Sequence, residues 1–206
     1  CPEYSSDTVS VIVEELPVVN DDEVLPGMGF GTHPHENMEI ISIPLEGSLA
    51  HRDSTGREAE IRSGEVQIMS AGSGITHSEY NHSKEQKVSF LQLWIFPREK
   101  NIKPRYAQKY FDFAGKPNEL VTVVAPDGDD ALWINQEAWL SIGHIRAGNA
   151  LTYRLKKTGN GVYLFLIDGR IVTQNLTLAR RDGLGIEGAE TIEISASTDA
   201  QLLVVE

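Results

Sequence analysis

GFGTHPHENMEI at residues 29–40 and IMSAGSGITHSEYN at residues 68–81 are the two most informative stretches of this chain. Both have the short, alternating pattern of a β-strand, in which every second side chain projects from the same face. One face of each stretch carries two potential metal ligands, and these are His33 and His35 in the first and His77 and Glu79 in the second. Two such pairs on facing strands can bind one ion, so the sequence predicts a metal site.

The rest of the chain also alternates with a period of two. Short runs rich in Ile, Val, Leu and aromatic residues predict strands at residues 38–45, 65–69, 87–96, 163–167, 191–195 and 202–205. Turn signals such as Glu46-Gly47, Asn160-Gly161 and Asp168-Gly169 separate the runs at spacings typical of a β-sandwich or barrel. No convincing amphipathic helix is longer than about three turns. We therefore expect an all-β protein.

A change of composition after Phe96 indicates a domain boundary. Residues 97–118 hold three prolines, many charges and no sustained alternation, which is typical of an irregular bridging segment. Similar turn signals in the two halves suggest an internal duplication. We predict an N-terminal domain at residues 1–112 with the metal site and a C-terminal domain at residues 113–206 without metal ligands, because five of the six histidines precede the boundary.

The composition excludes several classes of function. The net charge is −12 and the few Lys and Arg residues are scattered, whereas a nucleic-acid surface needs a basic stripe. No apolar run approaches the ~20 residues that span a bilayer. Cys1 is the single cysteine, so no intrachain disulfide can form and Cys-rich zinc frameworks are excluded. We expect a cytoplasmic monomer that binds neither membrane nor nucleic acid.

The motifs of the chain resemble those of the cupin superfamily. Gly27-x5-His33-x-His35-x3-Glu39 resembles the first cupin motif, and Gly64-x5-Ser70-x-Gly72-x4-His77-x3-Asn81 resembles the second, with two extra residues before its histidine. The two stretches quoted above are more specific, and they are similar to those of the pirin family, particularly its bacterial quercetinase-type members. The resemblance implies a bicupin fold, with two β-barrel or jelly-roll domains and the metal site in the N-terminal one.

Spacing alone leaves two candidates for the carboxylate ligand. Glu39 would be in phase with His33 and His35 on a straight strand, and cupins in general take their carboxylate from this position. Pirins take it from two residues after the second-motif histidine, which is Glu79 here, and Glu79 shares a strand face with His77. The resemblance decides for Glu79, with Glu39 as a carboxylate that could orient an imidazole.

A donor set of three imidazoles and one carboxylate suits one divalent ion among iron, manganese, nickel, copper and zinc. The resemblance implies Fe(II) and a quercetin 2,3-dioxygenase-like reaction on a flavonol-like aromatic substrate and dioxygen. Glu79 would be the catalytic residue, because it could accept the substrate's hydroxyl proton as a general base. The alternative is a non-enzymatic regulator whose metal changes oxidation state and alters its affinity for a protein partner. A cupin sugar isomerase ranks last, because no Arg or Lys lies inside either metal motif.

Other prominent residues have simpler explanations. His51 and His82 lack a partner at ligand spacing, so we expect ordinary surface or hydrogen-bonded histidines. The glycines at positions 27, 29 and 31 are predicted to form turns and points of close approach rather than a phosphate loop, because no helix start follows them. The apolar residues expected to share the barrel interior with the metal are Met28, Phe30, Met38, Phe90 and Trp94.

Overall fold

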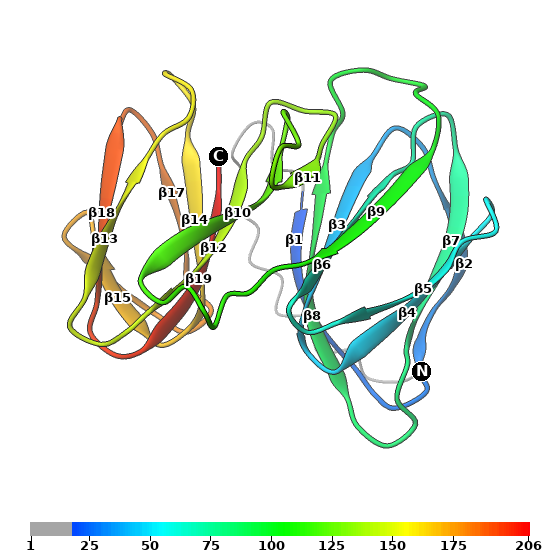
Figure 1. Cartoon of the computed structure of the whole chain (residues 1–206), viewed down its shortest axis with the longest axis horizontal. Coiled ribbons are helices and arrows are strands. Elements are labelled where there is room, and N and C mark those ends of the chain that lie inside the picture. Colours follow the sequence, from blue (N-terminus) through cyan, green and yellow to red (C-terminus); the bar gives the residue numbers. More distant parts are fainter. Residues whose placement is uncertain (1–17) are drawn as a thin grey trace. The chain divides into compact units, whose positions relative to one another are not determined.

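The computed structural model describes residues 18–206, so the single cysteine, Cys1, lies outside the described part. The described residues form nineteen β-strands, and they divide into two compact units (Figure 1). The first unit takes the described residues up to Phe111 together with Ile134–Gln136, and the second takes Asp112–Trp133 and Glu137–Glu206. Within residues 18–206 there is no helix that is long and apolar enough to cross a membrane. The prediction of an all-β protein is confirmed.

Two antiparallel sheets build the first unit. The five-stranded sheet consists, in spatial order, of β1 (Val18–Val24), β8 (Val88–Ile95), β3 (Glu39–Glu46), β6 (Glu65–Ser70) and β9 (Arg105–Tyr110). The four-stranded sheet consists of β2 (Gly29–His35), β7 (Ile75–Asn81), β4 (Ser48–Asp53) and β5 (Glu58–Arg62). Leu49 and Ile61 of the second sheet pack against Val88 and Phe90 of the first. The two sheets therefore face each other across a common interior.

The interior of the first unit is built in layers, as strand β8 illustrates. Phe90 belongs to one buried apolar cluster, and Trp94 packs against a second cluster around Ile40. Gln92 lies between these two residues on the same strand face, and Ser42 of β3 lies directly opposite Gln92. A polar layer therefore crosses the interior between two apolar ends.

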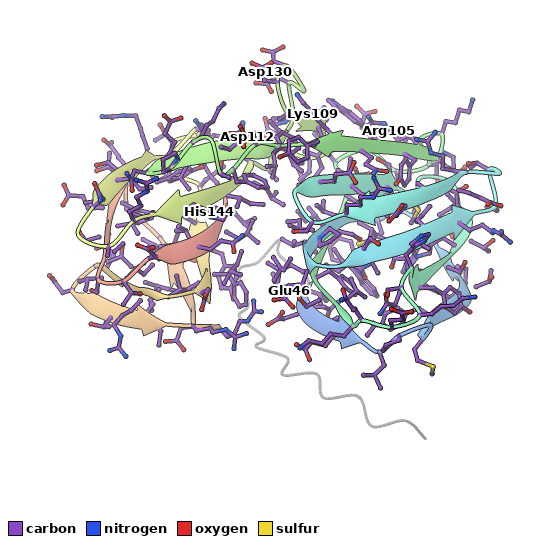
Figure 2. The ribbon with its side chains drawn as sticks, turned by 60° about the horizontal axis from the view of Figure 1, so that its bottom comes forward. Glu46, Arg105, Lys109, Asp112, Asp130 and His144 are labelled. Carbon is purple, nitrogen blue, oxygen red and sulfur yellow. The ribbon has the colours of Figure 1, made fainter. Side chains whose placement is uncertain are left out.

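The second unit is also made of two sheets. The six-stranded sheet consists, in spatial order, of β11 (Leu132–Trp133), β10 (Glu119–Ala125), β12 (Leu140–Ile145), β19 (Ala200–Val205), β14 (Val162–Asp168) and β17 (Gly183–Ile186). The four-stranded sheet consists of β13 (Ala150–Arg154), β18 (Thr191–Ala196), β15 (Arg170–Thr173) and β16 (Leu176–Ala179). Its core is predominantly apolar, with Leu164 and Leu202 packed among Ile171 and Ile194. The histidine of this unit is His144 on β12 (Figure 2).

The segment predicted to be irregular, residues 97–118, contains strand β9. This strand pairs with β6 from Ser70↔Arg105 to Glu65↔Tyr110. Its sequence alternates weakly because β9 is an edge strand whose side chains are half-buried or exposed. The first unit also takes the segment Ile134–Gln136 from the second half of the sequence. The domain bounds at residues 1–112 and 113–206 stay a prediction.

Candidate metal centre

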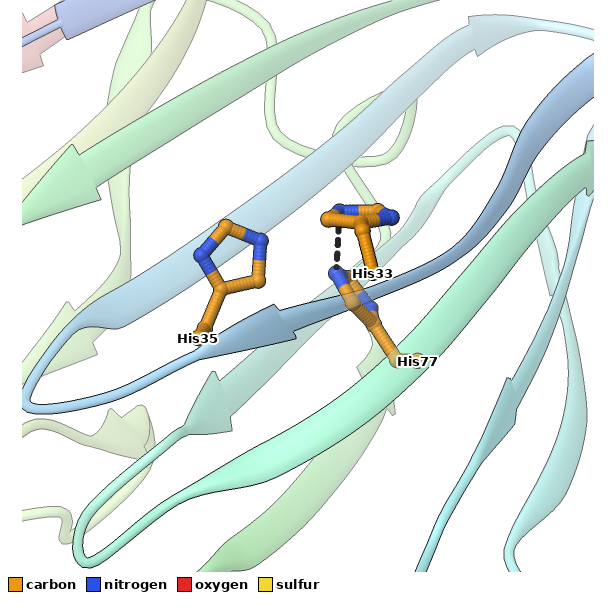
Figure 3. Close-up of side chains that lie close together, drawn as sticks. All are labelled: His33, His35 and His77. Atoms are coloured by element: carbon orange, nitrogen blue, oxygen red, sulfur yellow. Dashed lines mark hydrogen bonds between the residues drawn. The ribbon is translucent and has the colours of Figure 1, made fainter.

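Three imidazoles meet where β2 pairs with β7. His33 lies directly opposite His77, and the register of the two strands shifts between Phe30 and His33. This bulge separates the apolar start of β2 from its histidines, and bulges often re-aim side chains at functional sites. Pro34 is tolerated between the two histidines because β2 is an edge strand. Figure 3 shows the rings of His33, His35 and His77 gathered at this point.

The ring nitrogens are close enough to share one ion. The Nε2 atoms of His33 and His77 are 3.1 Å apart, and ligand atoms of His33, His35 and His77 all lie within 4.8 Å of one another. Two nitrogens bound at about 2.1 Å to one ion and at right angles to each other are about 3 Å apart. Nδ1 of His33 is 2.8 Å from the carbonyl oxygen of Gly31 and can donate to it. A proton on Nδ1 leaves Nε2 of His33 free to bind a metal.

Burial favours the neutral form of His77 and His35. Burial is the main reason why the pKa of His77 is lowered from 6.5 to about 3. His33, His35 and His51 lower this pKa further, whereas Asp53 raises it. The pKa of His35 is lowered in the same way, first by burial and then by His33. Because a metal binds only the neutral ring, these shifts favour metal binding at neutral pH. The donor chemistry of the cluster fits a divalent ion.

Glu79 follows His77 by two residues on β7, and its carboxylate is buried. Ser42 Oγ donates to Glu79 Oε1 at 3.2 Å, and Gln92 Nε2 donates to Oε2 at 2.7 Å. Burial raises the pKa of Glu79, while Gln92, His51 and Ser42 act in the opposite direction. Ligand atoms of Glu79, His77 and His51 lie within 4.8 Å of one another. Three of the four predicted ligands, His33, His35 and His77, therefore form one group, whereas Glu79 is grouped with His77 and with His51, which was not a predicted ligand.

His51 is a further member of the site that was not among the predicted ligands. This residue is 2% exposed and lies on β4 directly opposite Glu79. Its Nε2 is 3.0 Å from Asp53 Oδ2, and its Nδ1 is buried with no hydrogen-bond partner among the described residues. The prediction of a hydrogen-bonded histidine is confirmed. His51 was set aside because it lacks a partner at ligand spacing, but its ligand atoms lie within 4.8 Å of those of His77 and Glu79. The sequence feature that could have indicated this role is His51-x-Asp53, two potential ligands on one strand face. The pairing of β4 with β7 is what brings His51 opposite Glu79.

Glu39 lies on the face of β3 that points away from the imidazoles. Because Ser42 contacts Glu79, positions 40 and 42 of β3 face the interior of the first unit and Glu39 faces away from it. The expectation that Glu39 shares a strand face with His33 and His35 holds only if these residues lie on one straight strand. Residues 36–38 instead connect β2 to β3, which belong to different sheets.

The carboxylate of Glu39 has its own set of partners. Its Oε2 accepts a hydrogen bond from Ser70 Oγ at 2.8 Å and another from the backbone N of Asn135 at 3.3 Å. Burial raises its pKa, whereas Ser70, Asn135 and the positive charge of Arg105 lower it. Glu39 thus connects β3 to the segment Ile134–Gln136 within the first unit.

The apolar surroundings match the sequence-based expectation with one exception. Four of the five residues lie in or against the two buried clusters, and these are Phe30, Phe90, Met38 and Trp94. Met28 was wrongly placed in the interior, because it is 48% exposed. The Trp94 ring lies 5.2 Å from the ring of His35 at an interplanar angle of 77°. Trp94 therefore forms one wall of the imidazole cluster.

A cavity of about 490 Å³ lies beside the cluster. Its lining residues are Pro34, His35, Glu36, Ser54, Gly74, Ile75 and Thr76. Pockets for small organic ligands usually measure ~300–1,000 Å³. The cavity therefore has the size for such a ligand, with His35 on its wall.

Comparisons with known proteins agree with this architecture. Residues 6–95 match the pirin family model, and residues 122–206 match the model of the quercetinase C-terminal cupin domain. A quercetin 2,3-dioxygenase of Escherichia coli (strain K12) is 37% identical over 192 residues, which are 93% of this chain and 81% of the relative. A pirin-like protein of Caulobacter vibrioides is 38% identical over 193 residues, which are 93% of this chain and 82% of the relative.

One solved structure of a relative contains a bound metal ion. The bacterial pirin YhhW from Escherichia coli in complex with nickel(II) superposes with a TM-score of 0.87 at 33% identity, covering 96% of this chain and 88% of that one. The expected bicupin fold, with a candidate metal site in the N-terminal half, is confirmed. Through its sequence relatives and its fold, this chain belongs to the pirin family.

Proposed function

We propose that this protein is a metal-dependent dioxygenase that cleaves a flavonol such as quercetin. The observation that carries the proposal is the group of His33, His35 and His77, whose ligand atoms lie within 4.8 Å of one another. The Escherichia coli relative named quercetin 2,3-dioxygenase supports the choice of reaction. The ion would be Fe(II), with Glu79 as the fourth ligand.

The residues of the chain have distinct parts in this proposal. When bound, the ion supplies Lewis acidity and open positions for oxygen ligands. His33, His35 and His77 would hold it through neutral nitrogens. Glu79 would take the hydroxyl proton of the flavonol as a general base. A carboxylate has about four lone-pair sites, so the bonds from Ser42 and Gln92 leave acceptor capacity for both tasks.

The substrate would approach through the cavity beside His35. Pro34 offers apolar surface to a flat ring, and the hydroxyl groups of Ser54 and Thr76 can bind polar substituents. The reaction takes up both atoms of dioxygen and releases one ring carbon of the flavonol as carbon monoxide. Carbon monoxide is therefore the diagnostic product.

The test is to load the protein with Fe(II) without oxygen, and then to add quercetin and dioxygen. We expect release of one carbon monoxide per flavonol consumed, measured beside the loss of flavonol absorbance. His33→Ala should lose both metal and activity. His144→Ala is the matched control in the second unit and should keep both, because His144 lies outside the imidazole cluster.

The outcome also decides between enzyme and regulator. No carbon monoxide from wild-type protein that verifiably holds iron would contradict the dioxygenase and favour the metal-responsive regulator with a protein partner. Loss of metal in His144→Ala would contradict the proposed site itself. The cytoplasmic location and the monomeric state stay predictions.

A further inference from the structure

Glu79 is the end point of a chain of hydrogen bonds that begins at Trp94. The indole Nε1 of Trp94 donates to Gln92 Oε1 at 3.0 Å. Gln92 Nε2 donates to Glu79 Oε2 at 2.7 Å and to Ser42 Oγ at 3.3 Å. Ser42 Oγ donates to Glu79 Oε1 at 3.2 Å. Both carboxylate oxygens of Glu79 are therefore bound by this chain.

The indole determines the direction of the chain. An indole N–H can only donate, so the amide oxygen of Gln92 must face Trp94 and its NH2 group must face Glu79. In the rotated amide, NH2 would meet the indole N–H and the oxygen would meet the carboxylate. Both of those contacts are repulsive. Trp94 thus selects the amide orientation in which the NH2 group of Gln92 donates to Glu79.

Strand register makes this arrangement rigid. Gln92 and Trp94 are alternate residues of β8, and Ser42 lies directly opposite Gln92 on β3. The side chains have little room to move, because Ser42 is 0%, Glu79 2% and Gln92 8% exposed. Trp94 also contacts the ring of His35, with 5.2 Å between ring centroids. Trp94 thus contacts an imidazole of the cluster and also orients Gln92, which donates to Glu79.

We propose that Gln92, oriented by Trp94, is the positioning residue of Glu79 and holds this carboxylate in the orientation needed beside His77 of the imidazole cluster. The proposal rests on the proposed function in one respect, because it takes Glu79 as the fourth ligand. Carboxylates that bind metals are themselves held by hydrogen bonds, and removing such partners typically costs about 10–100-fold in metal affinity. Gln92 should therefore contribute to metal binding without touching the ion.

The test uses Co(II) alone, with affinity measured by calorimetry and ligand geometry by the visible spectrum. Gln92→Met keeps the length of the side chain and removes its donors, so we expect about 10–100-fold weaker binding and a changed Co(II) spectrum. Gln67→Met is the matched control. Gln67 is a buried glutamine opposite Ser42 on β6, and its Oε1 has no hydrogen-bond partner among the described residues. Its substitution should leave both readouts unchanged.

Trp94→Phe tests the chain of hydrogen bonds itself, because it keeps an aromatic ring against His35 and removes the N–H group that donates to Gln92. We expect weaker Co(II) binding in Trp94→Phe, and no further loss when this substitution is added to Gln92→Met. A purely structural role of Trp94 would make the two effects additive, and that result would overturn the claim that Trp94 acts through Gln92. Unchanged or tighter binding in Gln92→Met would overturn the positioning role.

Two further checks keep the conclusion separate from folding and from catalysis. Circular dichroism establishes that each variant is folded, and if Gln92→Met is not, unchanged Co(II) affinity in folded Trp94→Phe overturns the proposal. No flavonol is present in these titrations. Failure of wild-type protein to release carbon monoxide would therefore count against the proposed dioxygenase and not against the positioning of Glu79.

Discussion

At the residue scale, two buried carboxylates of the first unit have different tasks. Glu79 lies beside His77 and His51 and receives hydrogen bonds from Ser42 and Gln92. Glu39 faces away from the imidazoles, so its side chain belongs to a different environment. The position of a carboxylate on a strand face therefore separates a potential ligand from a residue that connects segments.

Substitution of each carboxylate by its amide should separate these tasks. Glu79→Gln should lower metal affinity and flavonol cleavage by more than the about 10–100-fold that is typical for loss of a ligand's hydrogen-bonding partner, because the ion itself loses a charged oxygen ligand. Glu39→Gln should leave both nearly unchanged, since the amide oxygen can still accept from Ser70 and Asn135. Metal titration and turnover of the two variants provide the check. The reverse order would assign the ligand role to Glu39.

At the scale of elements, the site depends on the close pairing of β2 with β7, and Gly29 permits it. A Cβ atom at position 29 would lie 2.3 Å from the backbone oxygen of Glu79 and 2.5 Å from Cα of Tyr80. The backbone of β7 cannot yield locally without moving His77. The prediction that Gly29 is a point of close approach is confirmed, and Gly27, with φ of 67°, is the turn residue that precedes it.

Gly29→Ala should therefore force β2 away from β7. We expect a loss of about 1–3 kcal/mol in the free energy of unfolding, as for other overpacked sites, together with weaker metal binding. Gly31→Ala is the control on the same strand, because its Cβ would meet only the Tyr80 hydroxyl at an ordinary 3.8 Å. Thermal unfolding and a Co(II) titration test both variants. Equal stability of Gly29→Ala and Gly31→Ala would refute the steric argument.

At the scale of the whole molecule, the buried His77 couples stability to pH. Its pKa is 6.5 in the reference state and about 3 in the folded protein. Between these values the unfolded chain binds more protons, so the free energy of unfolding of the metal-free protein should fall as the pH drops from about 6.5 toward 3. One such group contributes at most about 1.4 kcal/mol per pH unit. Glu39 and Glu79 act in the opposite direction, because burial raises their pKa values and the folded state then holds protons more tightly.

Urea unfolding of metal-free His77→Ala isolates this contribution. The stability difference between wild type and the variant should shrink steadily between pH 6.5 and pH 4, since only the wild type has to keep a buried imidazole neutral. His82→Ala serves as the control, because His82 is exposed and lies outside the cluster. A difference that stays constant over this range would contradict the assignment.

The all-β class and the local pairs His33 with His35 and His77 with Glu79 could be predicted from the amino-acid sequence, because a period of two is a property of one strand. The fold family followed from motifs that are likewise local. The contacts between side chains on different strands became known from the folded structure. In that structure Glu39 faces away from the imidazoles, His51 lies opposite Glu79, and Gln92 lies within 2.7 Å of that carboxylate. These contacts depend on register between strands that are far apart in the chain, and alternation within one strand carries no information about its neighbours.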